Sequence, residues 1–392
     1  MNTKYQIILY GATGFTGKLC AEYFKENYPD LNWAIAGRNE NKLRELREEL
    51  NLECDIFVAD SDDYEAIKNF VSQTKVVLSA AGPFARYSTK VVEACVECQT
   101  HYTDITGENH WVKGLIDRFH EKAALDGTRI VPSCGYDSIP SDLGVYFSVT
   151  RSKQPVSHVT VYHSAKGGAS GGTTETMFTM GPLPKEMRDP FLLNPKDSVS
   201  DAQKNKSKDD FSVKPIPGTD AFSGMGLMAF ANTRVVRRSA ALFDLNQKSY
   251  GPDFTFKELG SYPSKAAARI TSFFLMSAFL IIATPLRYLV RPFLPKPGDG
   301  PSKEARDNGW FRGLFVANLE DGTEKRFEIF GSGDPGYKST SKMVCESALT
   351  LAFSEDLPFG SEFGGVLTSA VGLGDPLISR LMKAGITFEE LS

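Results

Sequence analysis

Three glycines near the start of the chain have the spacing of a dinucleotide-binding turn. Gly11, Gly14 and Gly17 follow a short apolar run and precede a helical pattern that begins near Phe15. The first glycine permits a sharp turn, the second lets a pyrophosphate approach the backbone, and the third lets the helix pack closely on the strand. This GxxGxxG pattern is a variant of the dinucleotide fingerprint. We therefore assign cofactor binding to Gly11, Ala12, Thr13, Gly14, Phe15, Thr16 and Gly17.

The position about twenty residues beyond such a turn selects between the two nicotinamide dinucleotides. An NAD-preferring site usually has an acidic residue there, whereas this chain has Arg38. A guanidinium suits a 2′-phosphate through a bidentate, charge-assisted contact, and Lys42 lies one helical turn further. The alternative is that Arg38 is a solvated surface charge. We predict NADP(H) as the cofactor and assign Arg38, Lys42 and Asp60, which follows the third expected strand, to its site.

Small residues follow the fourth expected strand, at the carboxyl edge that borders the cofactor in such a sheet. Their lack of bulk would let the ribose and nicotinamide approach the backbone, although a plain strand-to-helix turn has the same composition. These residues are Ala80, Ala81, Gly82 and Pro83. Arg86 and Tyr87 come directly after them and could face either the cofactor or the substrate.

A dense polar block, residues 133–142, follows the sixth expected strand. Reduction of an enoyl or carbonyl group needs a hydride from the cofactor and a proton donor near the developing enolate or alkoxide. We assign catalysis to Tyr136, as the preferred donor, and to Asp137, and we place Cys134 in the cofactor site. The alternative is structural, because Pro140 suits a first helical turn and Ser138 or Asp137 could cap it.

Other groups lack a supporting pattern. Asp104 and Glu108, after the fifth expected strand, suit acid–base work or helix capping equally well. The glycine-rich loop 167–172 could bind an anion or a substrate head group. Cys95 and Cys98 have CxxC spacing without a second pair, and the five histidines show no ligand spacing, so we predict no metal site.

The elements that must position these groups alternate between strand and helix over residues 1–150. Strands are expected at 5–10, 33–37, 55–59, 75–79, 101–105 and 128–133, and helices at 18–27, 41–50, 64–72, 88–98 and 111–126. Asn39 and Asp62 are suitable helix caps. This alternation predicts an α/β Rossmann domain, that is, a doubly wound parallel sheet that binds NAD(P).

The pattern changes after residue 150. Residues 181–225 are rich in Pro, Lys, Asp and Ser and predict a surface loop, and Asp321 and Gly322 mark a hairpin. We predict a discontinuous α+β substrate and dimerisation domain with an antiparallel sheet over 151–335. A helix expected over 338–353 belongs to a C-terminal helical segment, 336–392, that packs back on the Rossmann domain.

One segment departs from the soluble pattern. An uncharged stretch of seventeen residues begins at Ile270 and ends at Leu286, inside a hydrophobic insertion over 265–292 that has basic residues on both flanks. This length is the lower limit for a membrane span, and spanning would separate the hairpin from the nucleotide domain. Two alternatives stay open: a buried or dimer-interface helix, or a peripheral membrane contact with the basic flanks on the headgroups.

Composition limits the remaining classes of protein. The 392 residues suffice for two domains, and a net charge of −4 gives no reason to expect a nucleic-acid partner. Six cysteines without a disulfide framework, and no secretory pattern before the first strand, favour a reducing cytoplasmic location, with membrane association left open. A sheet domain with an apolar helix suits a homodimer.

Several motifs together resemble those of the saccharopine dehydrogenase-like oxidoreductases. They are residues 80–84 (AAGPF), 103–108 (TDITGE), 130–144 (IVPSCGYDSIPSDLG), the 168–174 loop, 237–239 (RRS), 333–338 (GDPGYK) and 364–368 (GGVLT). The resemblance covers nearly the whole chain. It implies a Rossmann domain with a discontinuous second domain, NAD(P) binding and frequent association with lipid or membrane.

The resemblance also implies two different chemistries. Mycobacterial members act as trans enoyl reductases in complex-lipid synthesis. True saccharopine dehydrogenases form or split a C–N bond through an imine and need several arginines for their dicarboxylate substrates, and no such set is evident in this sequence. We therefore predict an NADP(H)-dependent reductase of an apolar or lipid-linked enoyl or carbonyl compound. The alternatives are an amino-acid imine reductase and a non-catalytic NADP(H)-binding protein on a lipid surface.

Overall fold

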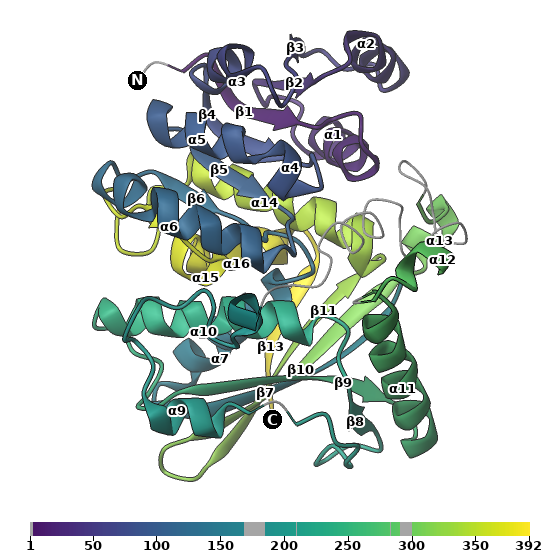
Figure 1. Cartoon of the computed structure of the whole chain (residues 1–392), viewed down its shortest axis with the longest axis vertical. Helices are drawn as coiled ribbons and strands as arrows, with labels where there is room; N and C mark the ends of the chain where they lie inside the picture. The colour runs from purple at the N-terminus through teal and green to yellow at the C-terminus, as the bar shows by residue number, and fades with distance from the viewer. Residues whose placement is uncertain (1–2, 168–184, 209, 283, 291–299) are drawn as a thin grey trace.

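A seven-stranded parallel sheet forms the upper half of the molecule (Figure 1). The computed structural model describes residues 3–167, 185–208, 210–282, 284–290 and 300–392. The strand order is β12-β6-β5-β4-β1-β2-β3, so the winding direction reverses between β1 and β4, as in a Rossmann fold. The strands are β1 (Tyr5–Tyr10), β2 (Trp33–Gly37), β3 (Asp55–Val58), β4 (Thr74–Ser79), β5 (His101–Asp104), β6 (Arg129–Val131) and β12 (Gly365–Val366).

Helices cover both faces of this sheet because its strands are apolar on both sides. Ile7 and Leu9 of β1 face one core, and Ile8 and Tyr10 face the other. The helices of residues 1–152 are α1 (Phe15–Asn27), α2 (Glu40–Glu49), α3 (Tyr64–Val71), α4 (Phe84–Tyr87), α5 (Thr89–Cys98), α6 (Asn109–Leu125) and α7 (Ile139–Ser152). The predicted Rossmann fold is confirmed.

One of the two expected helix caps differs by a residue. Asn39 accepts a hydrogen bond from the Lys42 amide, as a cap of α2 should. At α3 the cap is Asp63, which accepts from the Ala66 amide, and not Asp62. Asp62 instead forms an ion pair with Lys90. Either aspartate suits the cap by composition, so only the exact start of the helix decides between them.

The second sheet forms the lower half of the molecule and has the order β13-β11-β10-β7-β9-β8 (Figure 1). Its strands are β7 (Val156–Lys166), β8 (Phe222–Gly224), β9 (Thr255–Tyr262), β10 (Trp310–Leu319), β11 (Glu324–Ser332) and β13 (Ile386–Leu391). The sheet is mixed, not antiparallel as expected, because β7 and β9 pair in parallel. A crossover that contains α10 (Ala229–Leu245) separates these two strands, and such a long connection permits the parallel pairing.

The polar stretch 181–225 contains short elements as well as loop. Its described part includes the 3₁₀ turn η1 (Lys185–Arg188), α9 (Asp201–Lys206) and β8. Figure 1 shows α7 and α10 as a layer between the two sheets.

The C-terminal segment is less helical than expected and contributes to both sheets. A π-helical turn, η3 (Pro335–Ser339), precedes α14 (Thr340–Phe353), which packs beside α1 on the first sheet. The chain then forms β12 at the edge of the first sheet and β13 at the edge of the second. The helices α15 (Ser369–Gly372) and α16 (Gly374–Lys383) connect these two strands.

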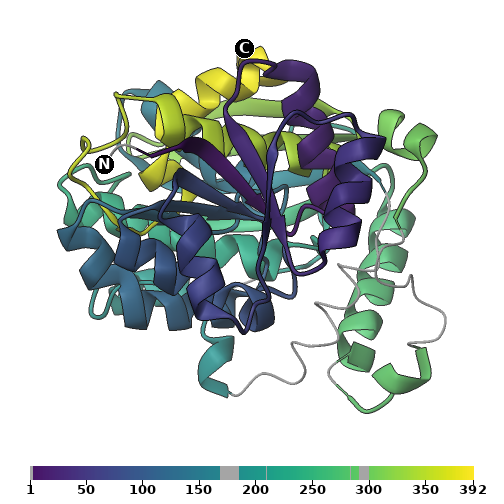
Figure 2. The same cartoon turned by 90° about the horizontal axis from the view of Figure 1, so that it is seen from above.

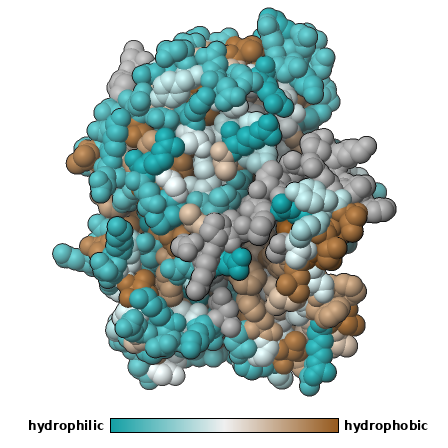
Figure 3. Space-filling view, viewed as in Figure 1, coloured by the Kyte–Doolittle hydropathy of each residue, from teal (hydrophilic) through white to brown (hydrophobic). Residues whose placement is uncertain are grey.

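The apolar stretch forms a helix that stands at the side of the molecule. Figure 2 shows α11 (Lys265–Ile282) and the short α12 (Arg287–Val290) projecting beside the two sheets, and α13 (Lys303–Asp307) follows in the chain. Of the residues in α11, Ala268 alone is buried, while Phe273 is 69% and Phe274 65% exposed. Figure 3 shows the resulting apolar surface in brown. The alternative of a helix buried inside this chain is therefore wrong. The dimer-interface and lipid alternatives stay predictions.

Candidate functional site

The glycine turn connects β1 to α1 and leaves the start of the helix open. Gly11 has φ +81°, which a residue with a side chain rarely adopts, and a Cβ there would lie 2.7 Å from the Ala81 amide nitrogen. A Cβ on Gly17 would lie 2.2 Å from the Gly11 carbonyl oxygen. Gly14 caps α1 with no side-chain hydrogen bond. The first amides of α1 are thus available to a pyrophosphate, and this cradle fits a dinucleotide.

The other predicted residues of this turn differ in exposure. Ala12 is buried, whereas Thr13 and Gly14 are exposed. Phe15 and Thr16 are half-buried, and the Phe15 ring packs edge-on against Tyr337, with the ring centres 5.1 Å apart. Phe15 therefore joins the nucleotide turn to the segment that leads into α14.

Arg38 lies directly after β2 with an exposed side chain. Its guanidinium is 5.7 Å from the centre of the Tyr87 ring, and the guanidinium of Arg86 is 5.1 Å from the same centre. The structure thus places Arg86 and Tyr87, which the sequence left between cofactor and substrate, beside Arg38. Two guanidinium groups around one aromatic ring suit a phosphate next to a flat base.

Lys42 and Asp60 are exposed. Asp60 accepts a hydrogen bond from the Asp62 amide, which fixes the loop after β3. The pKa of the Tyr10 phenol is raised to about 12, mainly by burial and next by the negative charge of Asp60. The positive charge of Arg38 lowers the same pKa. Asp60 and Arg38 therefore lie near the same ring at the carboxyl end of β1.

The small residues after β4 line the adjacent strand end. Ala80 and Ala81 are half-buried, Gly82 is exposed and Pro83 is buried. The buried Glu108 holds this loop, since its carboxylate accepts from the Phe84 amide at 2.7 Å and the Ala85 amide at 3.1 Å. Of the two roles left open for Glu108, the structure shows capping.

Asp104 also has a structural role. It is fully buried and accepts hydrogen bonds from the Thr106 amide, the Ser133 amide and the Tyr102 hydroxyl, each at 2.9 Å. Burial raises its pKa to about 7, and the three donors oppose that rise. Asp104 thereby fixes the loop after β6 relative to β5.

Tyr136 and Asp137 lie on the loop that joins β6 to α7, and both are half-buried. The Tyr136 amide donates to the Thr340 hydroxyl at 3.0 Å, which ties the loop to the start of α14. Burial, followed by the charges of Glu258 and Asp137, raises the pKa of the Tyr136 phenol well above its ordinary value. Burial also raises the pKa of Asp137 to about 6. Tyr136 therefore stays protonated at neutral pH.

Cys134 is on the same loop but points inward. Its side chain is fully buried, and the thiol donates to the Val131 carbonyl at 3.2 Å. Its amide donates to the Asp104 carbonyl at 2.6 Å, and the whole residue is buried, so the structure does not expose this predicted cofactor residue. The glycine-rich loop 167–172 lies outside the described residues beyond Gly167.

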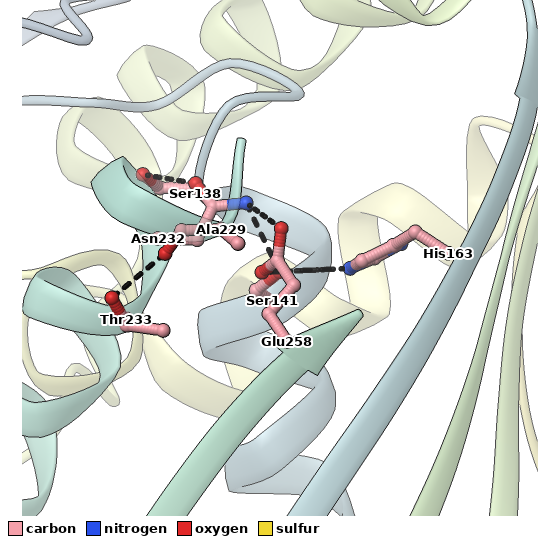
Figure 4. Close-up of polar contacts among 7 residues, drawn as sticks. All are labelled: Ser138, Ser141, His163, Ala229, Asn232, Thr233 and Glu258. Carbon is pink, nitrogen blue, oxygen red and sulfur yellow. Dashed lines mark hydrogen bonds and ion pairs between the residues drawn. The ribbon is translucent and has the colours of Figure 1, made fainter. Parts of the chain in front are cut away.

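A buried polar cluster that the sequence did not reveal lies next to this loop (Figure 4). We call Ser141, His163, Asn232 and Glu258 the Glu258 cluster. The Ser141 hydroxyl lies 2.7 Å from Glu258 Oε2 and 2.9 Å from His163 Nε2, and Asn232 Nδ2 donates to Glu258 Oε1 at 2.9 Å. The Tyr136 ring packs edge-on against the His163 ring, with the centres 6.2 Å apart.

The cluster combines a proton-binding carboxyl with a neutral imidazole. Burial raises the pKa of Glu258 to about 7, although the hydrogen bonds from Ser141 and Asn232 oppose the rise. Burial lowers the pKa of His163 to about 4. The four residues come from α7, β7, α10 and β9, so no local sequence signal links them. In the sequence, Ser141 was part of the polar block, and nothing singled out the other three residues.

The buried arginines hold the fold together. Three arginines are buried in the described part of the chain, and each donates to backbone carbonyls: Arg129 to Gly372 at 2.6 Å, Arg237 to Pro190 at 3.0 Å, and Arg238 to Val366 at 2.6 Å. They are thus engaged with the backbone and do not converge on a dicarboxylate pocket. The described residues also contain no group of three or more His, Cys, Asp or Glu side chains that could hold a metal.

Comparison with known proteins identifies the first domain. Residues 7–131 match the model of the saccharopine dehydrogenase NADP binding domain. The chain is 35% identical to a putative trans-acting enoyl reductase of Mycobacterium tuberculosis and 33% identical to a trans-acting enoyl reductase of Mycobacterium ulcerans, and in each case the alignment covers 98% of this chain and 97% of the relative.

A solved structure supports the fold. The apo saccharopine dehydrogenase (L-Glu forming) of Saccharomyces cerevisiae matches 99% of this chain and 100% of its own, with a TM-score of 0.55 and 12% identity. At that identity the likeness concerns the arrangement of the two domains alone. Together with the relatives and the NADP-binding model, it shows that the chain belongs to the saccharopine dehydrogenase-like family of NADP(H)-dependent oxidoreductases.

Proposed function

We propose that the protein reduces an apolar or lipid-linked enoyl or carbonyl compound with NADPH. The observation that carries this proposal is the position of Tyr136, a protonated phenol on the loop after β6, at the same sheet edge as the glycine turn. In a Rossmann sheet, ligands bind outside the carboxyl ends of the strands. The names of the mycobacterial relatives favour an enoyl substrate.

The chain would contribute positioning and a proton. The amides at the start of α1 hold the pyrophosphate, and Arg38 with Arg86 binds the 2′-phosphate. When bound, NADPH supplies a hydride to the substrate carbon. The Tyr136 hydroxyl then donates its proton to the enolate or alkoxide oxygen, since such an oxygen is a stronger base than the phenolate. Asp137, half-buried beside it, orients the substrate or relays a proton.

The arginines disfavour an amino-acid imine reductase. A substrate with several carboxylates needs several cations in one pocket, and Arg129, Arg237 and Arg238 are engaged with backbone carbonyls. The imine alternative therefore has no buried arginine at the described site to support it.

The exposed apolar helix supports a lipid-linked substrate. Ile270, Phe273, Phe274 and Leu280 of α11 are each more than half exposed, and the basic residues Lys265 and Arg269 lie at one end of the helix. Among the described residues, this one helix is long and apolar enough to cross a membrane, by length and composition alone. However, α11 is attached to the second sheet, because the Met225 amide, directly after β8, donates to the Ser272 hydroxyl. We therefore propose that α11 lies on a lipid surface and does not cross the membrane.

In this proposal the protein is a cytoplasmic enzyme that contacts a membrane peripherally through α11. Exposed apolar patches of this kind mark interaction sites. A homodimer that covers α11 is the competing arrangement, and the vesicle experiment in the Discussion distinguishes the two.

The test is NADPH oxidation with trans-2-enoyl thioesters of four to sixteen carbons, with matched 2-ketones and α-ketoglutarate plus lysine as the other classes. We expect turnover of a long-chain enoyl or carbonyl compound. Tyr136→Phe should lower kcat by about 100-fold or more, the usual contribution of a general acid, without weakening NADPH binding. Turnover of the amino-acid pair alone would establish the imine alternative. Tight NADPH binding with no turnover of any class would favour the non-catalytic alternative.

A further inference from the structure

The Glu258 cluster contains one hydroxyl proton between two groups that can accept it. Ser141 has a single O–H, yet its oxygen lies within hydrogen-bond distance of both Glu258 Oε2 and His163 Nε2. Asn232 Nδ2, which only donates, satisfies Glu258 Oε1, and the Asn232 carbonyl accepts from Ser138 at 3.4 Å. Asn232 Nδ2 also donates to the Ser141 oxygen at 3.3 Å. Of the other two contacts of Ser141, one must therefore also run toward it, from the carboxyl or from the imidazole.

Two arrangements satisfy all these hydrogen bonds. In the first, Glu258 is neutral and Oε2–H donates to Ser141, which donates to His163 Nε2, and the imidazole proton is on Nδ1. In the second, Glu258 is anionic, Ser141 donates to Oε2, and His163 Nε2–H donates to Ser141. Conversion of the first to the second moves one proton from Oε2 to Oγ and one from Oγ to Nε2. The Nδ1 proton leaves the cluster for solvent, and because Nδ1 is buried against β10, it does so only when the packing between His163 and β10 opens.

No cation fixes the cluster in the anionic arrangement. The ion pairs of the described residues include only one contact of Glu258, with His163 at 3.8 Å, and that imidazole is neutral near pH 7. Asp137, on the loop before α7, is the charged group that acts on Glu258, and it disfavours the carboxylate. The Tyr136 phenol also faces Glu258. Nδ1 of His163 lies against the backbone of β10 at Arg312.

The cluster is close to the edge of the sheet where the nicotinamide is expected. Ser141 lies one helical turn after Ser138, at the start of α7, and the Tyr136 ring packs on His163. Figure 4 shows Ser138, Ser141 and His163 with Glu258 between α7, α10 and the strands β7 and β9. A positive charge on the oxidised nicotinamide would therefore favour the anionic arrangement, and the neutral reduced ring would not.

We propose that the Glu258 cluster is a proton store coupled to the nicotinamide: it holds one proton while NADPH is bound and releases it to solvent when the nicotinamide is oxidised. The proposal rests on the proposed function, because it requires NADP(H) to bind with its nicotinamide beside Tyr136. Ser141 and Glu258 are buried, so we place the cluster behind the reacting atoms, as a set of positioning residues.

The first test needs no substrate. NADP⁺ and NADPH are titrated separately into the full chain at pH 7 by calorimetry, in phosphate and in Tris, whose ionisation enthalpies differ. The 2′-phosphate is common to both nucleotides, so its own proton exchange cancels in the difference. We expect NADP⁺ to release about 0.4 proton more than NADPH, for a fall of about one unit in the carboxyl pKa. Equal release by the two nucleotides would overturn the proposal.

Two variants identify the group that releases the proton. Glu258→Gln keeps the shape and removes the titration, so it should abolish the difference. Glu346→Gln is the matched control, because Glu346 is a buried carboxyl elsewhere that accepts from Tyr23, and it should leave the difference unchanged. A difference that persists in Glu258→Gln and disappears in Asp137→Asn would assign the store to Asp137 and overturn the proposal.

A second readout covers the case in which Glu258→Gln does not fold. Nitrogen NMR of the wild-type histidines, with His163 assigned through His163→Gln, reports which ring nitrogen carries the proton. We expect Nδ1 with NADPH and Nε2 with NADP⁺, and an unchanged tautomer would contradict the store. If neither nucleotide binds, the proposed function itself fails. In that case the cofactor-free chain tests whether the cluster titrates. A change of the His163 tautomer with a midpoint near pH 7 would show that it does, and an unchanged tautomer between pH 5 and 9 would show that it does not.

Discussion

The guanidinium of Arg38 lies 5.7 Å from the centre of the Tyr87 ring, although the two residues come from different strand ends of the first sheet. Arg86 lies over the same ring at 5.1 Å. We propose that cofactor choice depends on two loops, because the predicted arginine after β2 meets a ring and a second cation that follow β4. The first prediction concerns this pair.

Arg38→Ala should weaken NADPH binding by about 10- to 100-fold, the usual value of a hydrogen bond to a charged group, and leave NADH binding unchanged. Nicotinamide fluorescence measures both affinities. Arg44→Ala is the control, because Arg44 is an exposed arginine of α2 that pairs with Glu40. An equal loss for NADH, or an equal effect of Arg44→Ala, would contradict the assignment of the 2′-phosphate to Arg38.

Gly17→Ala should destabilise the protein by about 1–3 kcal/mol and weaken both nucleotides, because its methyl group would lie 2.2 Å from the Gly11 carbonyl oxygen. Gly114→Ala is the matched control. It is also a helical glycine, but nothing lies within 4 Å of its Cβ position, so alanine should stabilise α6 by up to about 1 kcal/mol. Urea unfolding compares the two. The same sign for both variants would show that the close approach is not what requires Gly17.

Asp104 should make the free energy of unfolding fall as the pH rises through neutrality. Its pKa is raised to about 7 in the folded chain, so between its unfolded value and pH 7 the folded state binds more protons than the unfolded state. Its stabilising contribution is then complete below the unfolded pKa and is lost as the pH rises through about 7.

The measurement is the difference in unfolding free energy between wild type and Asp104→Asn at pH 5 and pH 7.5. We expect wild type to lose of order 1 kcal/mol or more relative to the variant over this interval. Asparagine retains an acceptor for the Thr106 and Ser133 amides, so the comparison isolates the titration. A pH-independent difference would mean that Asp104 is ionised in the folded chain.

The double variant Phe273→Asp with Phe274→Asp should bind vesicles of phosphatidylcholine and phosphatidylserine at least about tenfold more weakly than wild type. Flotation measures the bound fraction, and Leu125→Asp, at an 88% exposed residue of α6, is the control. If the wild-type protein does not bind vesicles and sediments as a dimer, and the double variant sediments as a monomer, then α11 is a subunit interface instead.

Local patterns predicted the elements that form the cofactor half of this site. The strand, glycine turn and helix from β1 to α1 follow one another in the sequence, so their geometry depends on neighbouring residues. Asn39 and the hairpin at Asp321 are likewise local. The parallel pairing of β7 with β9 was missed, because a long crossover, which no local pattern specifies, brings these strands together.

The Glu258 cluster was missed for a related reason. Ser141 and Glu258 are 117 residues apart and meet only after α7 and β9 have packed. His163 lies on a strand and, alone, has the pattern of a buried structural histidine. The exposure of α11 also required the structure, because an apolar helix has the same sequence whether it is covered or not. Only tertiary packing distinguishes these cases.

The strands β12 and β13 impose an order on biosynthesis. Each is an edge strand, one on either sheet, and both come after residue 364. On the ribosome, the glycine turn and most of both sheets emerge long before these last strands do. Until then, the edges of β6 and β11 are left open to pairing with other chains. The edge of β6 therefore stays open from residue 131 until β12 is made at residue 365, and this late closing step limits how soon the first sheet is protected from aggregation.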